Sequence, residues 1–118
     1  AAFVAMHRNL YWRTAEGMAL DTGAYVLALE AAVGRSPTVI GKPAAAFFAA
    51  GVDALGLEAC EVLMVGDDIL NDVLGAQAAG LHGCLVRTGK FRADAVAAAD
   101  GEPEIVVDSF ADVPSLLR

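Results

Sequence analysis

Short apolar runs alternate with segments of helical periodicity along most of the chain. The apolar runs predict buried strands at residues 37–40, 61–65, 81–87 and 105–107. The segments that follow them predict helices at residues 43–55, 69–79, 92–99 and 110–117. Strands that alternate with helices in this way favour a parallel sheet with helices on both faces. The pattern therefore predicts an α/β fold.

The first 36 residues follow a different pattern. Apolar and aromatic residues predict short strands at 3–6 and 11–13. The segment from Ala24 to Val33 has apolar residues at the spacing of one helix face and predicts a helix. Gly34 follows it as the expected C-cap.

The most informative segment is the apolar run Val62–Val65, which ends abruptly in a cluster of acids. Gly66 is expected to break the strand, and Asp67, Asp68 and Asp72 follow it closely. Three carboxylates at the carboxyl end of a buried strand repel one another and are costly to desolvate. A bound divalent cation would offset this cost. Ligands of open α/β sheets also bind at this end of the strands.

We expect Asp67, the first acid after the strand, to bind Mg²⁺ directly, with Asp68 as a second candidate ligand. Mg²⁺ takes one or two protein carboxylates and fills its remaining positions with water and phosphate oxygens. Asp72 lies one helical turn beyond Asp68 and is expected to orient a bound water or a ligand. The alternative is that the acids cap the helix that follows, since carboxylates are favoured at a helix N-terminus.

Two other segments are expected near the same edge of the sheet. Gly41-Lys42-Pro43 opens a helix, with the proline expected in its first turn. Lys42 can reach an anion there, and a phosphoryl group beside Mg²⁺ and carboxylates needs a counter-cation; an exposed lysine is the alternative. Thr88 follows the next strand and is expected to contact substrate or to support the Asp67 loop, although an ordinary turn fits equally well.

The composition limits the classes of function. The 118 residues suffice for one small domain, and 57% hydrophobic with 19% charged residues suits a packed globular protein. A formal net charge of −7 argues against nucleic acids and anionic membranes as partners. No run approaches the roughly 18 apolar residues of a membrane helix. Cys60 and Cys84 fit no zinc-ligand spacing and are expected to be buried reduced thiols, which suits a cytoplasmic protein.

The order of these motifs resembles the haloacid dehalogenase (HAD) superfamily of phosphatases. The residues that carry the resemblance are Gly41-Lys42-Pro43, Leu63–Asp68, Asp72, Gly75-Ala76-Gln77, Gly80 and Val86–Arg92. The last three are similar to the branch with a large α/β cap, near the phospholysine phosphohistidine inorganic pyrophosphate phosphatases. The resemblance covers essentially the whole chain. It implies the end of a cap domain at residues 1–36 and the second half of a Rossmann-like HAD core at residues 37–118.

The resemblance implies Mg²⁺-dependent hydrolysis of small phosphorylated compounds through an aspartyl phosphate. It assigns the phosphate-binding lysine to Lys42, the acidic metal ligand to Asp67 and the supporting acid to Asp72. The family's Asp-x-Asp nucleophile motif occurs nowhere in the 118 residues, and its phosphate-binding Ser/Thr strand is also missing. We therefore expect the chain to be the C-terminal portion of a longer phosphatase and to be inactive by itself.

Two further expectations concern partners and alternatives. The strand at residues 62–65 would have a bare apolar edge, which favours a homodimer or packing against the missing N-terminal half. A non-catalytic metal-binding domain, or a receiver-like interaction domain, would share the strand–helix pattern and the paired acids. Receivers place their lysine after the acids, whereas Lys42 precedes them here.

Overall fold

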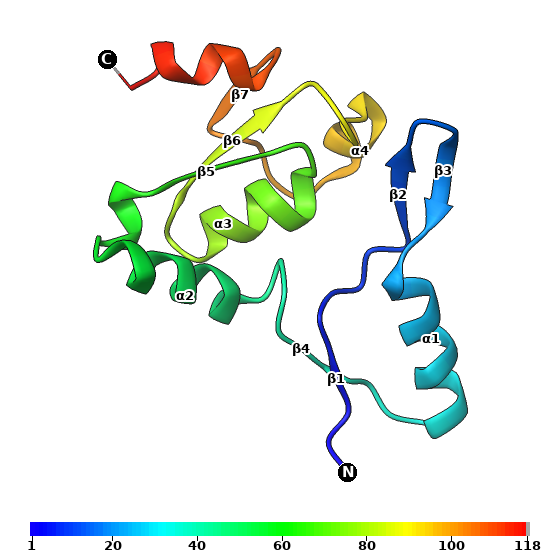
Figure 1. Cartoon of the computed structure of the whole chain (residues 1–118). Helices are drawn as coiled ribbons and strands as arrows, with labels where there is room; N and C mark the ends of the chain where they lie inside the picture. The colour runs from blue at the N-terminus through cyan, green and yellow to red at the C-terminus, as the bar shows by residue number, and fades with distance from the viewer. Residues whose placement is uncertain (118) are drawn as a thin grey trace.

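A computed structural model describes residues 1–117 of the chain. Its largest sheet has three parallel strands in the order β5–β6–β7 (Figure 1). The strands are β5 (Leu63–Gly66), β6 (His82–Val86) and β7 (Ile105–Val107). Because β5 and β6 are parallel and in register, with Val65 opposite Cys84, the segments that follow both strands emerge at the same edge of the sheet. This arrangement places the acidic loop after β5 beside the turn after β6.

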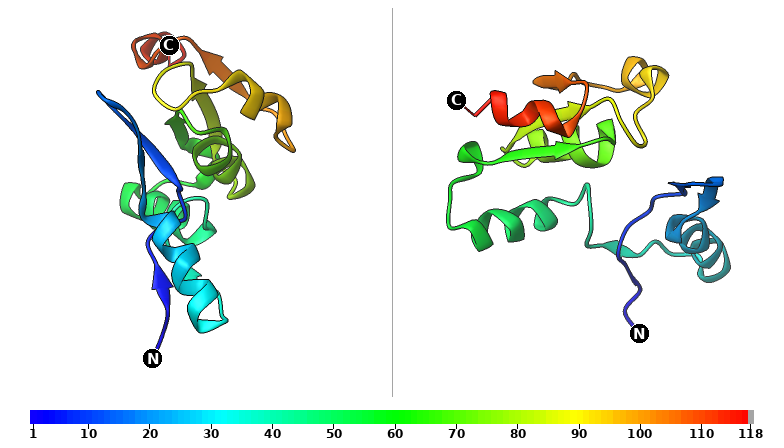
Figure 2. Two further views of the ribbon diagram at one scale, coloured as in Figure 1. Left: turned by 90° about the vertical axis from the view of Figure 1, so that its right-hand side faces the viewer. Right: turned by 45° about the horizontal axis from the view of Figure 1, so that its top comes forward.

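Helices cover both faces of this sheet, as predicted (Figures 1 and 2). On one face lie the π-helical turn η2 (Ile69–Leu74) and the helices α2 (Ala45–Leu55), α3 (Gly75–Ala78) and α4 (Ala93–Ala98). The 3₁₀ segment η3 (Phe110–Ser115) lies on the opposite face. The predicted α/β fold with parallel strands is thus confirmed.

Two apolar clusters hold the helices against the sheet. Phe48 of α2 packs with Ala76 and Leu81 in the first cluster. Val73 of η2 packs with Leu85 of β6 in the second cluster, to which α4 also contributes. The second cluster contains Ile69 and Val73, which directly follow the acids, so this cluster anchors the acidic loop to the sheet.

The first third of the chain forms a separate group of elements. It contains β1 (Val4–Ala5), β2 (Tyr11–Thr14), β3 (Gly17–Leu20) and α1 (Thr22–Val33). β2 and β3 form an antiparallel hairpin, and β1 pairs in parallel with β4 (Thr38–Val39). β3 was not predicted, because its sequence Gly-Met-Ala-Leu has no alternation of polar and apolar residues.

Several predicted elements differ from those observed. α2 begins at Ala45, so Pro43 precedes the helix and is not in its first turn. The helix predicted at 69–79 begins as a π-helical turn, because the N–H of Val73 donates to the carbonyl of Asp68 five residues earlier. The last helix is a 3₁₀ segment that ends at Ser115.

The two cysteines differ in their surroundings. Both are free thiols. Cys84 is buried in β6, as expected, and burial raises the pKa of its thiol. Cys60 is exposed on the 3₁₀ turn η1 (Ala59–Glu61), so the expectation that it is buried was wrong.

Two predictions about the outside of the molecule can be compared with the structure. Within residues 1–117, β5 has a strand partner on one side only, which confirms the predicted bare edge. None of the helices in that range combines the length and apolar character that a membrane crossing requires.

Candidate functional site

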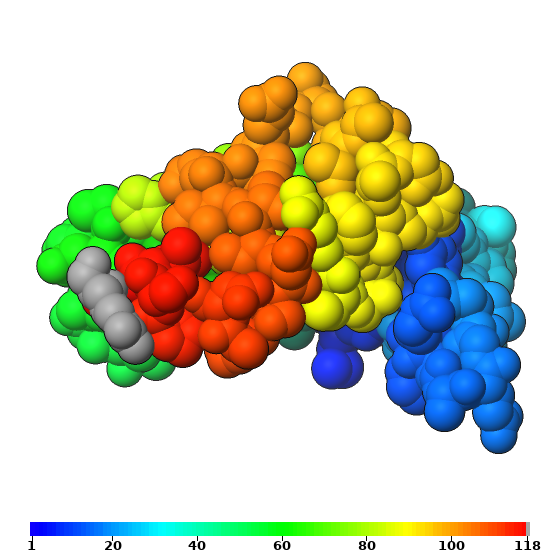
Figure 3. Space-filling view, turned by 90° about the horizontal axis from the view of Figure 1, so that it is seen from above, coloured from blue at the N-terminus to red at the C-terminus, as the bar shows by residue number. Residues whose placement is uncertain are grey.

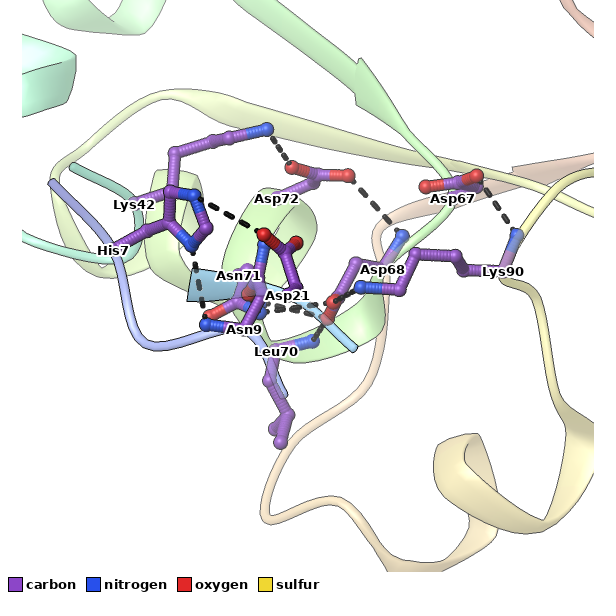
Figure 4. A network of polar contacts seen from close by, with 10 residues as sticks. All are labelled: His7, Asn9, Asp21, Lys42, Asp67, Asp68, Leu70, Asn71, Asp72 and Lys90. Carbon is purple, nitrogen blue, oxygen red and sulfur yellow. Dashed lines mark hydrogen bonds and ion pairs between the residues drawn. The ribbon is translucent and has the colours of Figure 1, made fainter. Parts of the chain in front are cut away.

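Asp67 is held at the carboxyl end of β5 by the turn that follows β6. Its Oδ2 accepts a hydrogen bond from the backbone N–H of Lys90 at 2.9 Å (Figure 4). The side chain is partly buried and lines a cleft of about 330 Å³. Asp67 therefore faces the cleft from a defined position, and the contacts recorded for residues 1–117 engage only one of its two oxygens.

Asp68 caps the π-helical turn that follows it. Its Oδ1 accepts from the backbone N–H groups of Leu70 at 3.1 Å and Asn71 at 3.0 Å. Its Oδ2 accepts from the Asn71 side chain at 2.9 Å, and the Lys90 Nζ lies 3.4 Å away. Burial by itself raises the pKa of Asp68, but the hydrogen bonds from Asn71 and the charge of Lys90 outweigh burial and lower this pKa below its ordinary value. The helix-capping alternative thus describes Asp68, whose role as a metal ligand stays a prediction.

Asp72 joins Lys42 to the acidic loop. The Lys42 Nζ lies 2.5 Å from Asp72 Oδ1, and the backbone N–H of Asp68 donates to Asp72 Oδ2 at 3.2 Å. The Asp72 side chain is only 7% exposed, whereas that of Lys42 is 35% exposed. A Cβ at Gly66 would lie 2.3 Å from Asp72 Oδ2. Glycine at position 66 is therefore required by the close approach of Asp72.

Thr88 lies outside this network. It is exposed at the start of the turn after β6, where its carbonyl accepts from the N–H of Phe91 at 3.0 Å. Its predicted contact with substrate stays a prediction. The turn does support the Asp67 loop, but it does so through Lys90. The sequence signals for Lys90 were its position after a predicted strand and its place in the segment Val86–Arg92, which carries part of the family resemblance.

The first third of the chain also contributes to the site, through side-chain contacts that the sequence did not specify. The Asn71 side chain donates to Asn9 Oδ1 at 2.8 Å, and the Lys90 Nζ lies 5.3 Å from the centre of the Tyr11 ring. His7 accepts from the N–H of Asn9 at 3.3 Å. A polar segment before β2 thus closes one side of the acidic loop (Figure 4).

The cleft beside Asp67 is bounded by three segments that are distant in the sequence. They are residues 8–11 from the first third of the chain, 67–71 from the acidic loop, and the turn and start of α4 at 90–96. Its wall combines carboxylates, side-chain amides and cations with the ring of Tyr11. Such a mixture of a few convergent polar groups with apolar surface is typical of a small-molecule site.

The carboxylate of Asp67 is more available to a magnesium ion than the carboxylate of Asp68. Both oxygens of Asp68 already accept hydrogen bonds, whereas Asp67 Oδ1 has no partner recorded within residues 1–117. In the same range no group of three or more His, Cys, Asp or Glu side chains converges on one point. A single carboxylate still fits Mg²⁺, which completes its shell with water and phosphate oxygens.

Sequence comparisons relate the chain to known hydrolases. A family model described as HAD-hydrolase-like matches residues 39–113. Phospholysine phosphohistidine inorganic pyrophosphate phosphatase of Mus musculus is 39% identical over 109 residues, which cover 92% of this chain and 39% of that protein. Haloacid dehalogenase-like hydrolase domain-containing protein 2 of Bos taurus is 41% identical over 110 residues, which cover 93% of this chain and 42% of that protein. The chain spans about two fifths of the length of these relatives.

Solved structures show the same relationship in three dimensions. A p-nitrophenyl phosphatase from Archaeoglobus fulgidus matches with a TM-score of 0.86 and 29% identity, over 98% of this chain and 46% of that one. A glycerol phosphate phosphatase from Mycobacterium tuberculosis, solved in complex with magnesium, matches with a TM-score of 0.79 and 34% identity, over 91% of this chain and 32% of that one.

Proposed function

Because the chain belongs to the HAD-like hydrolases, as its motifs predicted, we propose that it forms the lysine- and acid-bearing part of a phosphatase site for small phosphorylated compounds. The observation that carries this proposal is the Lys42–Asp72 pair at 2.5 Å. It brings a cation from the segment before α2 to the carboxyl end of β5, where Asp67 also lies. Lys42 lines a hollow next to the cleft of Asp67, and Arg8 and Asn71 line both. The Lys42 side chain is 35% exposed, and its ammonium is therefore available to an anion at this end of β5.

Each residue has a separate part in this proposal. Lys42 binds the phosphoryl group and stabilises the charge that develops on it. Asp72, which is nearly buried, orients the Lys42 ammonium. Asp67 holds Mg²⁺, which neutralises phosphoryl charge when it is bound. Asp68 keeps the loop in shape by capping η2, and its part as a second ligand is secondary because its oxygens are already engaged.

The nucleophile is the part that these residues do not supply. The 118 residues contain no Asp-x-Asp pair, and neither a lysine nor a magnesium ion replaces an attacking carboxylate. We propose that an aspartate from polypeptide outside these residues attacks phosphorus and forms an aspartyl phosphate. We also propose that residues 1–36 belong to a cap and residues 37–118 to the catalytic core, which is supported by the family match beginning at residue 39. The two free thiols support a cytoplasmic location.

Magnesium binding by the 118-residue chain tests the role of Asp67. Isothermal titration calorimetry with MgCl₂ is expected to show binding that Asp67→Asn weakens by at least about tenfold, since the substitution removes the charge of the proposed ligand. Asp53→Asn, which changes an exposed acid on α2, is the matched control and is expected to leave the affinity unchanged. Equal affinities of the wild type and Asp67→Asn would remove Asp67 from the site.

Phosphatase assays test the proposal about the nucleophile. The 118-residue chain with Mg²⁺ is expected to leave p-nitrophenyl phosphate intact. In a polypeptide that also carries Asp-x-Asp-x-Thr/Val, turnover is expected, and Lys42→Ala should reduce it by about 10²–10³-fold because a preorganised charge partner is lost. Turnover by the 118 residues alone would overturn the proposal that the nucleophile lies elsewhere.

A further inference from the structure

The Gly89–Lys90 turn contacts both neighbouring acids of the loop after β5, although only Thr88 of this turn was expected at the site. The backbone N–H of Lys90 donates to Asp67 Oδ2 at 2.9 Å. The ammonium of the same residue lies 3.4 Å from Asp68 Oδ2 and 5.3 Å from the centre of the Tyr11 ring. One residue therefore engages two carboxylates through two different groups.

Gly89 is required by the same contact. It has a φ of +57°, a conformation that favours glycine. A Cβ built at this position would lie 2.0 Å from Asp67 Oδ2 and 3.1 Å from its carboxyl carbon. The turn thus approaches the carboxylate so closely that any side chain at position 89 would displace Asp67 or break its hydrogen bond to Lys90.

We propose that the Gly89–Lys90 turn is the positioning element of Asp67. The N–H of Lys90 fixes the carboxylate through Oδ2 and leaves Oδ1 to bind a divalent cation. The Lys90 ammonium offsets the charge of Asp68. Because it is a cation beside the proposed metal site, it also repels Mg²⁺ and lowers the affinity of Asp67 for the ion. This inference rests on the proposed function, since it assigns Mg²⁺ to Asp67.

Substitutions at the two neighbouring positions are expected to change magnesium affinity in opposite directions. Gly89→Ala displaces Asp67 and should weaken Mg²⁺ binding of the 118-residue chain by about 10- to 100-fold, the range typical of groups that orient a metal ligand. Lys90→Ala keeps the N–H and removes the ammonium, so it should tighten binding by about two- to fivefold. Lys90→Arg restores the charge and should return the affinity to the wild-type value. Unfolding of a variant can only weaken its Mg²⁺ binding, so the tighter binding expected for Lys90→Ala cannot come from a loss of fold.

Gly51→Ala is the matched control, because a Cβ at this position on α2 meets no atom within 4 Å. Its Mg²⁺ affinity is expected to equal that of the wild type. Equal affinities of Gly89→Ala and the wild type would overturn the positioning role and leave the role of Asp67 intact. Weaker Mg²⁺ binding by Lys90→Ala than by the wild type would also overturn the positioning role of the Gly89–Lys90 turn.

Spectra of the metal-free chain separate this inference from the proposed function. The ¹H–¹⁵N signal of the Lys90 amide should move in Asp67→Asn, which alters its acceptor, and stay in place in Gly51→Ala. Absence of Mg²⁺ binding by the wild type would overturn the proposed function alone. A Lys90 amide signal that does not move in Asp67→Asn would overturn the positioning role.

Discussion

The acids after β5 are balanced by groups of the protein itself. Lys42 pairs with Asp72, the Lys90 ammonium lies beside Asp68, and the Lys90 N–H donates to Asp67. The repulsion expected among three carboxylates is therefore partly offset before any metal binds. Asp72 is therefore an ion-paired acid and Asp68 a capping acid, whereas Asp67 has an Oδ1 with no partner among residues 1–117.

Asp68 makes the stability of the loop dependent on pH. Its pKa is lowered in the folded chain, so it contributes stability that is present at neutral pH and lost as the pH falls through and below the ordinary aspartate value of about 3.9. Urea unfolding at pH 7 should find Asp68→Ala less stable than the wild type by about 1 kcal/mol, because the helix loses its cap. The difference should shrink at pH 3. Asp108→Ala, which removes an exposed partner of Arg87, should change stability by less than about 1 kcal/mol. A difference of equal size at both pH values would contradict this account of Asp68.

The packing of α2 against the start of α3 connects the Lys42 segment to the acidic loop. A Cβ at Gly75 would lie 2.8 Å from Pro43 Cβ and 3.2 Å from Phe48 Cε2. The two elements therefore touch without space for a methyl group, next to the lysine that reaches Asp72. The distance between Lys42 and the acids depends on this contact.

Two glycine-to-alanine substitutions should have opposite effects on the free energy of unfolding. Gly75→Ala forces α2 and α3 apart and should destabilise the chain by about 1–3 kcal/mol. Gly51→Ala, in the exposed interior of α2, meets open space and should stabilise the chain by about 0.4–1 kcal/mol through its lower unfolded-state entropy. Thermal or urea unfolding measures both, and a stabilising Gly75→Ala would show that this contact is looser than the structure indicates.

The chain as a unit is less compact than its length allows. Its radius of gyration is 15.5 Å, whereas a compact domain of this length has about 13.5 Å. The β2–β3 hairpin stands out from the other elements (Figure 3). It exposes Trp12, Met18 and Leu20. Among residues 1–117, one edge of β5 has no strand partner, which leaves backbone groups unpaired beside apolar side chains.

These surfaces predict that the isolated chain associates with itself. Sedimentation over a range of concentrations is expected to show a concentration-dependent dimer formed through β5. Leu63→Lys on β5 should weaken the dimer, since a lysine on an edge strand discourages pairing, whereas Val106→Lys on β7 at the other edge should not. A 12.1-kDa monomer at every concentration would contradict edge pairing.

The sequence by itself determined the α/β pattern and the position of the acids after β5, because both depend on residues close together in the chain. Runs, periodicity and a glycine before an acid are local signals. The prediction of an α-helix at 69–79 was wrong for its first turn, which is π-helical. The N–H of Val73 donates to the carbonyl of Asp68 five residues earlier, and an apolar pattern does not show such a bond.

Only the tertiary structure decided which groups surround the acids. Asp67 and Lys90 lie 23 positions apart, and Asn71 and Asn9 lie 62 positions apart. The first contact follows from the parallel pairing of β5 with β6, and the second from the way the segment before β2 folds over the loop. Each carboxylate's role depends on which donor reaches it, and donors from distant segments are brought there by the packing of the whole chain.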